Sequence, residues 1–392
     1  MHIHMKSVTG ALALGLALTS LAACGSDSSS GGDSDEPITV AVITTLSGGS
    51  AQLGLQSRDG ARLAVEQINA DGGIDGRPIE LKEYDGQLQP EVVVRAATRA
   101  ASVDGAVAII GPHSTGEALA LGPASERLKI PFITPSAATT EVTVDQPYAF
   151  RTTVVNREMA AGVVQFAVDQ GAEKLAILHD NGGFGVAFAG DLEASLEEQG
   201  LTPTTSQEFP VNATDMTAQL QKIKNSGADG VLLGCSGGND AGLAYRQMVD
   251  AGLNVPVFGS SCVIQGDAVR VGADAIAELP GIYGVVGFDT EKAKSQEFIE
   301  AYVEEFGEAS TYEYSAAAYD GVMMLAEALR ETGGEGGEAL KDALEGVTEY
   351  DPVNGKEGAT AGFAPDKHDS LSGDYLTPYV LSPDGTLERV TE

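Results

Sequence analysis

The sequence predicts an α/β protein with two similar lobes, each built on a helix-covered, mainly parallel sheet. From residue 37 onward, short β-rich runs alternate with longer helical patterns, as in parallel strands joined by helices. The alternation restarts after Arg151 and gives a second set of similar length. The chain has 392 residues, of which 43% are apolar, so it is long enough for two domains with buried cores.

The first set of elements opens with ITVAVITT at residues 38–45, a continuous apolar run typical of a strand buried on both faces. Ala61, Ala64 and Ile68 then fall on one face of a helix. We expect strands at 38–45, 79–84, 106–110 and 131–134, and helices around 61–68, at 91–103 and at 115–128.

The second set follows the same rhythm, beginning with a helix in which Met159, Val163 and Ala167 share a face. We expect further helices at 185–199, around 216–223 and at 240–251, and strands at 174–180, 204–209, 230–234 and 255–259. The remaining elements are a strand at 281–288, helices at 292–307 and 315–331, and strands and turns over 360–390.

The net charge argues against polyanionic partners. Lys and Arg total 23 against 57 Asp and Glu, which gives a formal net charge of −34. Because a polyanion repels another polyanion, we expect no nucleic-acid partner and no direct binding to anionic membrane surfaces.

The N-terminus predicts export. Lys6 is the only charged residue before position 24, and an apolar run at 11–18 leads to Leu-Ala-Ala-Cys at 21–24. A run this short cannot span a bilayer, which needs about 20 residues, but it fits a secretory signal peptide. The last four residues resemble a bacterial lipoprotein box, which implies that Cys24 is lipidated and anchors the protein to the outer face of the cell membrane. The Gly, Ser and acidic residues that follow are typical of a flexible tether.

Two further cysteines, Cys235 and Cys262, each follow an apolar run that predicts a strand. In an oxidising compartment they either pair as a disulfide or remain two separate buried thiols, and the sequence leaves both alternatives open.

Catalytic motifs are absent from the sequence. It contains no phosphate-binding loop, no His-Glu-x-x-His pair and no Gly-x-Ser-x-Gly elbow. His179 and Asp180 are adjacent on a predicted strand and so point to opposite faces. His113 falls near the predicted cleft at the end of a strand. It either hydrogen-bonds a ligand there or is structural, and we favour the structural interpretation. We therefore predict a protein that is not an enzyme and uses no cofactor or metal.

Residues 47–85 read SGGSAQLGLQSRDGARLAVEQINADGGIDGRPIELKEYD. This stretch resembles the opening of a leucine/isoleucine/valine-binding protein, the type I periplasmic binding protein that serves a branched-chain amino acid ABC importer. Further matches follow in the expected order over residues 37–365. They are Ile-Gly-Pro at 110–112, Ile-Thr-Pro-Ser-Ala at 133–137, His-Asp at 179–180, Phe-Gly at 184–185 and Ala-Tyr-Asp at 318–320.

The resemblance implies two hinged lobes that close over a small molecule, with chain crossings near 152–156, 284–289 and 360–366. The closed form would dock on two permease subunits with cytoplasmic ATPases, and we expect a monomer held at the membrane by its lipid alone. The predicted parts of the chain are a signal peptide at 1–23, a tether at 24–36, lobe 1 at 37–153 plus 287–363, and lobe 2 at 154–286 plus 364–392.

Ser114 to Glu117 have the spacing of a capping box after a predicted strand, at the sheet edge where open α/β sheets bind ligands. These residues either cap the helix alone or also hold a ligand carboxylate through backbone N–H groups and hydroxyls. Thr115 aligns with the family's carboxylate-binding hydroxyl, which favours the second interpretation.

The resemblance implies the other ligand-binding residues. In the loop Ser136-Ala137-Ala138-Thr139, Ser136 holds the position of an ammonium-binding carbonyl, while Ala138 falls where a hydroxyl is expected and Thr139 comes next. The second lobe would contribute Ser236 from its 236–240 loop. The apolar walls would be Leu53, Phe184 and Tyr314.

One position departs from the family pattern. Ser261 stands where amino-acid binders carry the carboxylate that pairs with the ligand's ammonium. Either another acid substitutes, with Asp240 the nearest candidate, or the ligand is not an α-amino acid. We interpret Asp240 itself as a solvated acid at a helix N-terminus. The alternatives to an importer component are a ligand sensor of the same fold for an amide, urea-like or aromatic acid ligand and, less favoured, a secreted enzyme.

Overall fold

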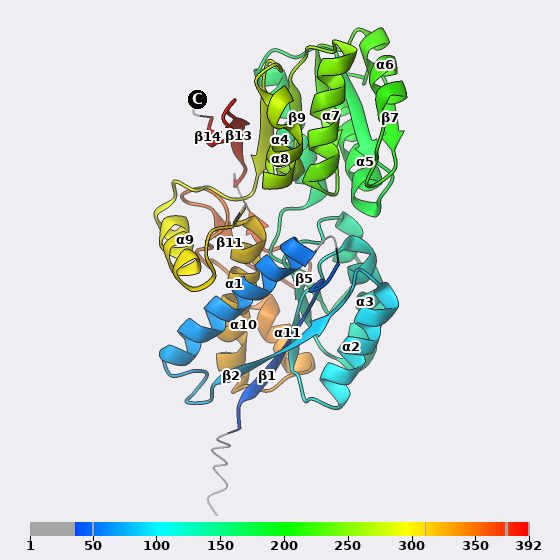
Figure 1. Ribbon diagram of the computed structural model, residues 1–392. Coiled ribbons are helices and arrows are strands. Elements are labelled where there is room, and N and C mark those ends of the chain that lie inside the picture. Colours follow the sequence, from blue (N-terminus) through cyan, green and yellow to red (C-terminus); the bar gives the residue numbers. More distant parts are fainter. Residues whose placement is uncertain (1–35, 49–50, 310, 373–374, 391–392) are drawn as a thin grey trace, which may run out of the picture. The chain divides into compact units, whose positions relative to one another are not determined.

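The structure is a computed structural model that describes residues 36–48, 51–309, 311–372 and 375–390 (Figure 1). The predicted signal peptide, Cys24 and nearly all of the predicted tether lie outside the described residues. Residues Glu36–Glu392 form one compact unit. In the part of the chain that is described, no helix has the length and apolar character needed to cross a membrane.

The first sheet has five parallel strands in the order β2-β1-β3-β4-β5. Every residue of β1 except Thr39 is buried, as expected for a strand covered on both faces. The strand order reverses direction between β1 and β3, so a crevice is expected at the carboxyl ends of these strands. The strands are β1 Ile38–Thr44, β2 Ile79–Asp85, β3 Ala108–Ile110, β4 Phe132–Thr134 and β5 Ala149–Arg151.

Helices cover both faces of this sheet. Val40 and Val42 pack toward α1 (Ala51–Ala70) and α10 (Glu313–Thr332), which lie side by side in Figure 1. Gly60 permits their close approach, because a Cβ there would lie 1.9 Å from the Ser315 carbonyl oxygen. The opposite face packs against α2 (Pro90–Ser102) and α3 (Thr115–Leu128), and α11 (Glu338–Glu345) packs beside α10.

The second sheet has seven strands in the order β14-β13-β10-β9-β8-β6-β7. Strands β6 to β10 are parallel, whereas β13 and β14 add an antiparallel edge. The strands are β6 Leu175–Asp180, β7 Ser206–Phe209, β8 Gly230–Gly234, β9 Val257–Gly259, β10 Ile282–Val286, β13 Thr377–Leu381 and β14 Leu387–Arg389.

Helices also sandwich this sheet. On one face, α4 (Asn156–Asp169) and α5 (Gly183–Glu198) share a core with Ile177 and Leu232. The other face packs against α6 (Thr217–Ser226), α7 (Gly238–Ala251) and α8 (Gly266–Ile276). The two sheets confirm the two-lobed, mainly parallel α/β class that the sequence predicts.

The remaining elements are α9 (Ala293–Phe306), which packs near α1, and the short strands β11 (Thr360–Ala361) and β12 (Leu371–Ser372). Between these strands the chain runs along β5. The Arg151 N–H donates to the His368 carbonyl at 2.9 Å, and the Ser370 N–H donates to the Arg151 carbonyl at 2.9 Å. Residues 368–370 therefore lie against the first sheet, although the predicted lobe division assigns them to the second.

Candidate functional site

A cavity of about 710 Å³ lies where the strands of both sheets end. Its walls come from the loops after β3 and β4 of the first sheet and after β8 and β9 of the second, together with the first residues of α5 and α10. Because the carboxyl ends of parallel strands share one edge, the alternating sequence pattern brings distant loops to one place.

Nine of the eleven residues predicted to bind ligand line this cavity. They are Leu53, Ser114, Thr115, Ser136, Ala138, Phe184, Ser236, Ser261 and Tyr314. The other two do not. Ala137 is buried in the core beneath α3, and the Thr139 carbonyl accepts a hydrogen bond from Arg151 Nη1 at 2.7 Å.

Arg151 explains that difference. Its guanidinium is fully buried, and its Nη1 also contacts the Ala137 carbonyl at 3.1 Å. The loop after β4 is thus held from behind, through carbonyls that face the arginine. Arg151 sits in another strand, so no local sequence pattern signals the contact.

The N-terminus of α3 contains the predicted capping box. The Glu117 N–H donates to Ser114 Oγ at 3.4 Å, while Ser114 Oγ and the Ser114 N–H donate to Glu117 Oε2 at 2.8 Å and 3.0 Å. The Ser114 hydroxyl is therefore occupied by the cap. Thr115 and Gly116 in the first turn line the cavity, and first-turn N–H groups have no acceptor within the helix. This wall is suited to an anionic group.

His113 and Tyr314 form an adjoining wall. Their rings meet edge to face with centroids 6.1 Å apart, and Ser136 Oγ lies 3.1 Å from His113 Nδ1. Burial lowers the pKa of His113 to about 4, so the imidazole is neutral at pH 7. The Tyr314 hydroxyl lies 3.2 Å from Ser261 Oγ, which comes from the second sheet's loop after β9.

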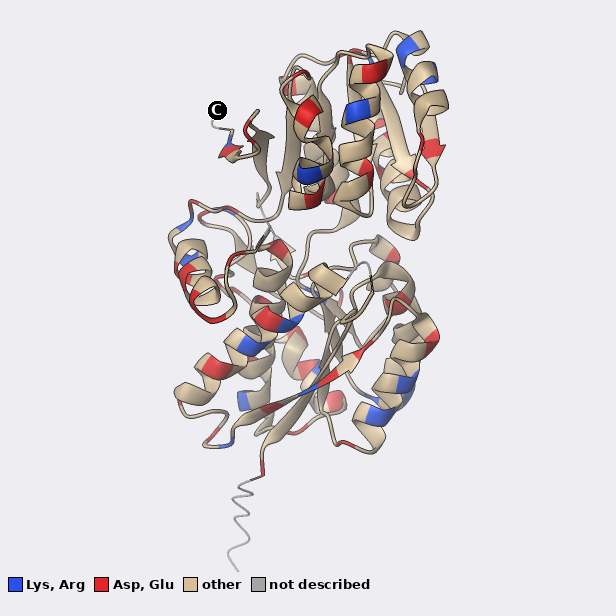
Figure 2. Ribbon diagram, viewed as in Figure 1, with Lys and Arg blue, Asp and Glu red and all other residues tan. Residues whose placement is uncertain are grey.

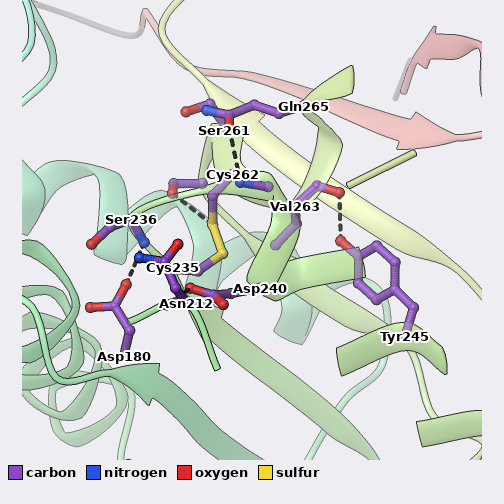
Figure 3. The surroundings of a disulfide bond; sticks show 12 residues. Asp180, Asn212, Cys235, Ser236, Asp240, Tyr245, Ser261, Cys262, Val263 and Gln265 are labelled. Atoms are coloured by element: carbon purple, nitrogen blue, oxygen red, sulfur yellow. Dashed lines mark hydrogen bonds between the residues drawn. A yellow bond between two sulfur atoms is a disulfide. The ribbon is translucent and has the colours of Figure 1, made fainter. Parts of the chain in front are cut away.

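A disulfide between Cys235 and Cys262 joins the loops after β8 and β9 (Figure 3). The structure thus adopts one of the two alternatives that the sequence leaves open. Both cysteines line the cavity. Gln265 Oε1 accepts from the Gly238 N–H at 3.2 Å, and the Tyr245 hydroxyl donates to the Val263 carbonyl at 2.5 Å. These contacts fix the short 3₁₀ helix Ser261–Ile264 that presents Ser261.

Two buried acids hold loops that follow β6, β7 and β8. Asp180 accepts the N–H groups of Gly182 and Ser236 at 2.8 Å and 2.5 Å. Asp240 accepts those of Asn212 and Ala213 at 3.1 Å and 3.0 Å, and burial raises its pKa. Asp240 is only 3% exposed, so our interpretation of it as a solvated acid is wrong. The reason is that the 211–213 loop folds over it, a contact between distant segments.

Phe184 begins the apolar part of the wall at the start of α5. Its ring stacks on that of Phe188, with centroids 5.3 Å apart. Leu53 and Met159 also line the cavity, so hydrocarbon surface is available beside the polar groups.

Glu313 and Asn156 are among the polar residues of the lining that sequence reasoning missed. Glu313 is 5% exposed, its Oε1 accepts the Gly287 N–H at 3.2 Å, and burial raises its pKa to about 6. Asn156 is 1% exposed, and among the described residues its Nδ2 has no hydrogen-bond partner. The only available signal was their position, since each lies at the start of a helix.

The charged residues of the cavity lining are all acidic, whereas the rest of the described chain carries both acidic and basic residues (Figure 2). Figure 2 shows Asp and Glu on helices of both lobes, with Lys and Arg among them. Among the described lining residues of the cavity there is no Lys or Arg, whereas Asp240, Asp267 and Glu313 are present.

Comparisons with known proteins agree with this architecture. The periplasmic binding protein family matches residues 37–370. The chain is 30% identical over 347 residues to the Leu/Ile/Val-binding protein homolog 7 of Brucella abortus, covering 84% of this chain and 86% of that protein.

Two solved structures share the fold. One is the branched-chain amino acid transporter substrate binding protein of Streptococcus pneumoniae in complex with isoleucine, with a TM-score of 0.78, 25% identity, and coverage of 90% of this chain and 99% of that one. The other is an ABC transporter solute binding protein of R. palustris in complex with 4-hydroxybenzoate, with a TM-score of 0.78, 22% identity, and coverage of 90% and 96%.

These relatives are binding proteins rather than enzymes, and the family match spans most of the described chain. The chain therefore belongs to the periplasmic binding protein family and is of the branched-chain amino acid transporter type.

Proposed function

We propose that the chain is the extracytoplasmic receptor of an ABC importer and binds a small amino acid or a related carboxylate in the cavity between its sheets. The observation that carries this proposal is the cavity of about 710 Å³ whose lining comes from the strand ends of both sheets. A concave site with apolar walls and a few converging polar groups is the usual form of a small-molecule site.

The polar groups of the first sheet's loops would bind the ligand first. Thr115 and Gly116 offer the first-turn N–H groups of α3 to a carboxylate, and the Thr115 hydroxyl adds a further donor. Phe184, Ser236 and Ser261 would then contact the ligand from the second sheet. A ligand favours the closed arrangement only if it binds that arrangement better than the open one, and contacts from both sides supply this difference.

The proposal also includes a lipid anchor in the membrane and a permease as partner. A lipid on Cys24 would hold the protein at the outer face of the membrane, and the tether at 24–36 would let it reach the permease. Replacing Cys24 with alanine should abolish the incorporation of labelled fatty acid and release the protein into the medium. Incorporation that persists in this variant would contradict the lipid anchor.

A ligand panel tests the binding function. Ligand at 100 times its dissociation constant adds about 2.7 kcal/mol to the free energy of unfolding, which thermal denaturation detects. The panel contains branched amino acids, aromatic acids, amides and urea. Circular dichroism is a suitable readout, because the chain has no Trp for intrinsic tryptophan fluorescence. An unchanged melting temperature with every compound would contradict the proposal.

The fold by itself does not choose between ligand classes. Solved structures with this fold hold isoleucine in one case and 4-hydroxybenzoate in another. Ser261 stands where the resemblance implies an ammonium-binding carboxylate. An uncharged residue at this position favours aromatic acids, which carry no ammonium group. The panel therefore pairs compounds that differ in the presence of an ammonium group.

A further inference from the structure

Building on the proposed function, we propose that Glu313 determines ligand class, because its carboxylate receives a cationic nitrogen of the ligand such as the ammonium of an amino acid. The proposal rests on three observations: the position of this side chain, the lack of a protein cation beside it in the described part of the chain, and the partners that the other acids of the cavity already have.

Glu313 is the first residue of α10 and lies where two cavities meet. It lines the cavity of about 710 Å³ and also a neighbouring one of about 150 Å³, as do Ser261 and Gln265. The carboxyl is anchored on one side, where Oε1 accepts the Gly287 N–H at 3.2 Å. The residue is 5% exposed, so little of its surface is open to solvent.

In the described part of the chain, no Lys or Arg pairs with this carboxyl. Among the described residues that line the two cavities there is no Lys or Arg, and His113 is neutral at pH 7. The groups that oppose the effect of burial on the pKa of Glu313 are the Gly287 N–H and the Ser261 hydroxyl, both uncharged. A buried carboxylate without a cationic partner is costly, and a bound ammonium would remove that cost.

The other two acids of the lining are already engaged. Both oxygens of Asp240 accept backbone N–H groups, from Asn212 and Ala213. Asp267 has a half-exposed side chain and pairs with Arg270 at 3.0 Å. Among the described residues, Glu313 is thus the buried acid of the lining that has neither a charged partner nor a backbone N–H donor on each of its two oxygens.

Hydrogen-bond donors elsewhere in the wall complete the pattern. Thr115 and Gly116 present the first turn of α3, and the buried Asn156 Nδ2 has no partner among the described residues. Donors suit a carboxylate, and Glu313 suits an ammonium. The lining as a whole therefore favours a molecule that carries both charges over an aromatic acid that carries only the negative one.

Isothermal titration at pH 8 of ligand pairs that differ only in the ammonium group tests this directly on the unaltered protein. Suitable pairs are leucine with 4-methylpentanoate and phenylalanine with 3-phenylpropanoate, with 4-hydroxybenzoate as a further carboxylate. We expect the amine-bearing member of a pair to bind on the order of 100-fold more tightly, because breaking a buried charge pair has an effect of at least that size.

Variants locate the effect. Glu313→Gln keeps the shape and an acceptor for the Gly287 N–H, and it should weaken amine binding on the order of 100-fold. Glu305→Gln, on the exposed side of α9, is the matched control and should leave affinity unchanged. Adding Ser261→Asp to the Glu313→Gln variant should restore part of the amine affinity, which a merely structural role of Glu313 would not predict.

Each outcome decides between the hypotheses. Tighter binding of the amines, lost in Glu313→Gln and retained in Glu305→Gln, supports the proposal. Equal or tighter binding of the des-amino acids by the unaltered protein overturns the role of Glu313 but leaves the receptor function intact. Unchanged amine affinity in Glu313→Gln also overturns it. Binding of no compound in the panel overturns the receptor function and this proposal together.

Discussion

The Ser261 Oγ and the Tyr314 hydroxyl lie 3.2 Å apart and join the two sides of the cavity. Ser261 follows strand β9 of the second sheet, whereas Tyr314 is the second residue of α10, the helix that packs on the first sheet. A contact of this kind stabilises one relative arrangement of the two sides, and it does so beside the groups that would hold a ligand.

Removal of the Tyr314 hydroxyl tests the importance of this contact. Tyr314→Phe keeps the ring against His113 but deletes the hydrogen bond, which is worth about 1 kcal/mol. We expect ligand affinity to fall about fivefold, as measured by titration. Tyr319→Phe is the control. The Tyr319 hydroxyl donates to Gln67 Oε1 at 2.6 Å, and neither residue lines the cavity. Equal losses of affinity in both variants would contradict a specific role for Tyr314.

The disulfide between Cys235 and Cys262 gives a second prediction. It closes a loop with a sequence separation of 27 residues. A covalent loop of this length stabilises a protein by about 3 kcal/mol through restriction of the unfolded chain. We expect reductant to lower the free energy of unfolding by that amount in urea titrations. Ligand affinity should fall as well, because both cysteines line the cavity.

The double variant Cys235→Ser/Cys262→Ser provides the control for the reductant. Its stability should equal that of the reduced protein and should not change when reductant is added. A variant that is as stable as the oxidised protein would show that the bond contributes little beyond the packing of the two buried residues.

Much of the fold follows from local patterns. The run at 38–45 predicted the doubly buried strand β1, and the predicted helix at 115–128 coincides with α3. Elements without a periodic signal were missed. Strand β5 has three residues, and α11 has eight. Helix α8 was also missed. It packs closely on α7 through small residues: a Cβ at Gly242 of α7 would lie 2.7 Å from the Ala268 carbonyl oxygen of α8.

The candidate site likewise contains residues that could be predicted from the sequence and residues that could not. Loops that follow strands were predictable, because parallel strands place their carboxyl ends at one edge. Glu313 was not, since an acid at the start of a helix ordinarily serves the helix dipole in solvent. Its burial depends on Gly287 and Ser261, which are distant in sequence, and such contacts leave no local pattern.

Arg151 provides a third prediction, on stability. Its guanidinium is fully buried and contacts Asp369 Oδ1 at 2.5 Å as well as the Ala137 and Thr139 carbonyls. Arg151→Ala deletes a fully buried cation, its ion pair with Asp369 and its hydrogen bonds to the two carbonyls, and we expect a loss of about 3–5 kcal/mol in the free energy of unfolding. Arg157→Ala, an exposed position on α4, should change stability by less than about 0.5 kcal/mol. Similar losses in both variants would contradict the structural role assigned to Arg151.

The fourth prediction concerns pH and links stability to the proposed role of Glu313. Burial raises the pKa of Glu313 from 4.5 to about 6, so the folded protein binds more protons than the unfolded chain between these two values. Stability then falls as pH rises through this window. Above pH 7 the ionised carboxyl costs about 2 kcal/mol, because one unit of pKa shift corresponds to about 1.4 kcal/mol.

Glu313→Gln removes this cost in the ligand-free protein. We expect the variant to be more stable than the unaltered protein by about 2 kcal/mol at pH 8. The two should be equally stable only well below the unfolded-state pKa of 4.5, where the glutamate is protonated in both states. Asp320, whose pKa is also raised to about 6 by burial, titrates identically in both proteins and cancels in the difference. Urea titrations at several pH values measure that difference. A variant that is less stable at pH 8 would contradict this prediction, as would a difference in the free energy of unfolding that does not depend on pH. Either result would show that the protein itself already stabilises the ionised carboxyl without a bound cation.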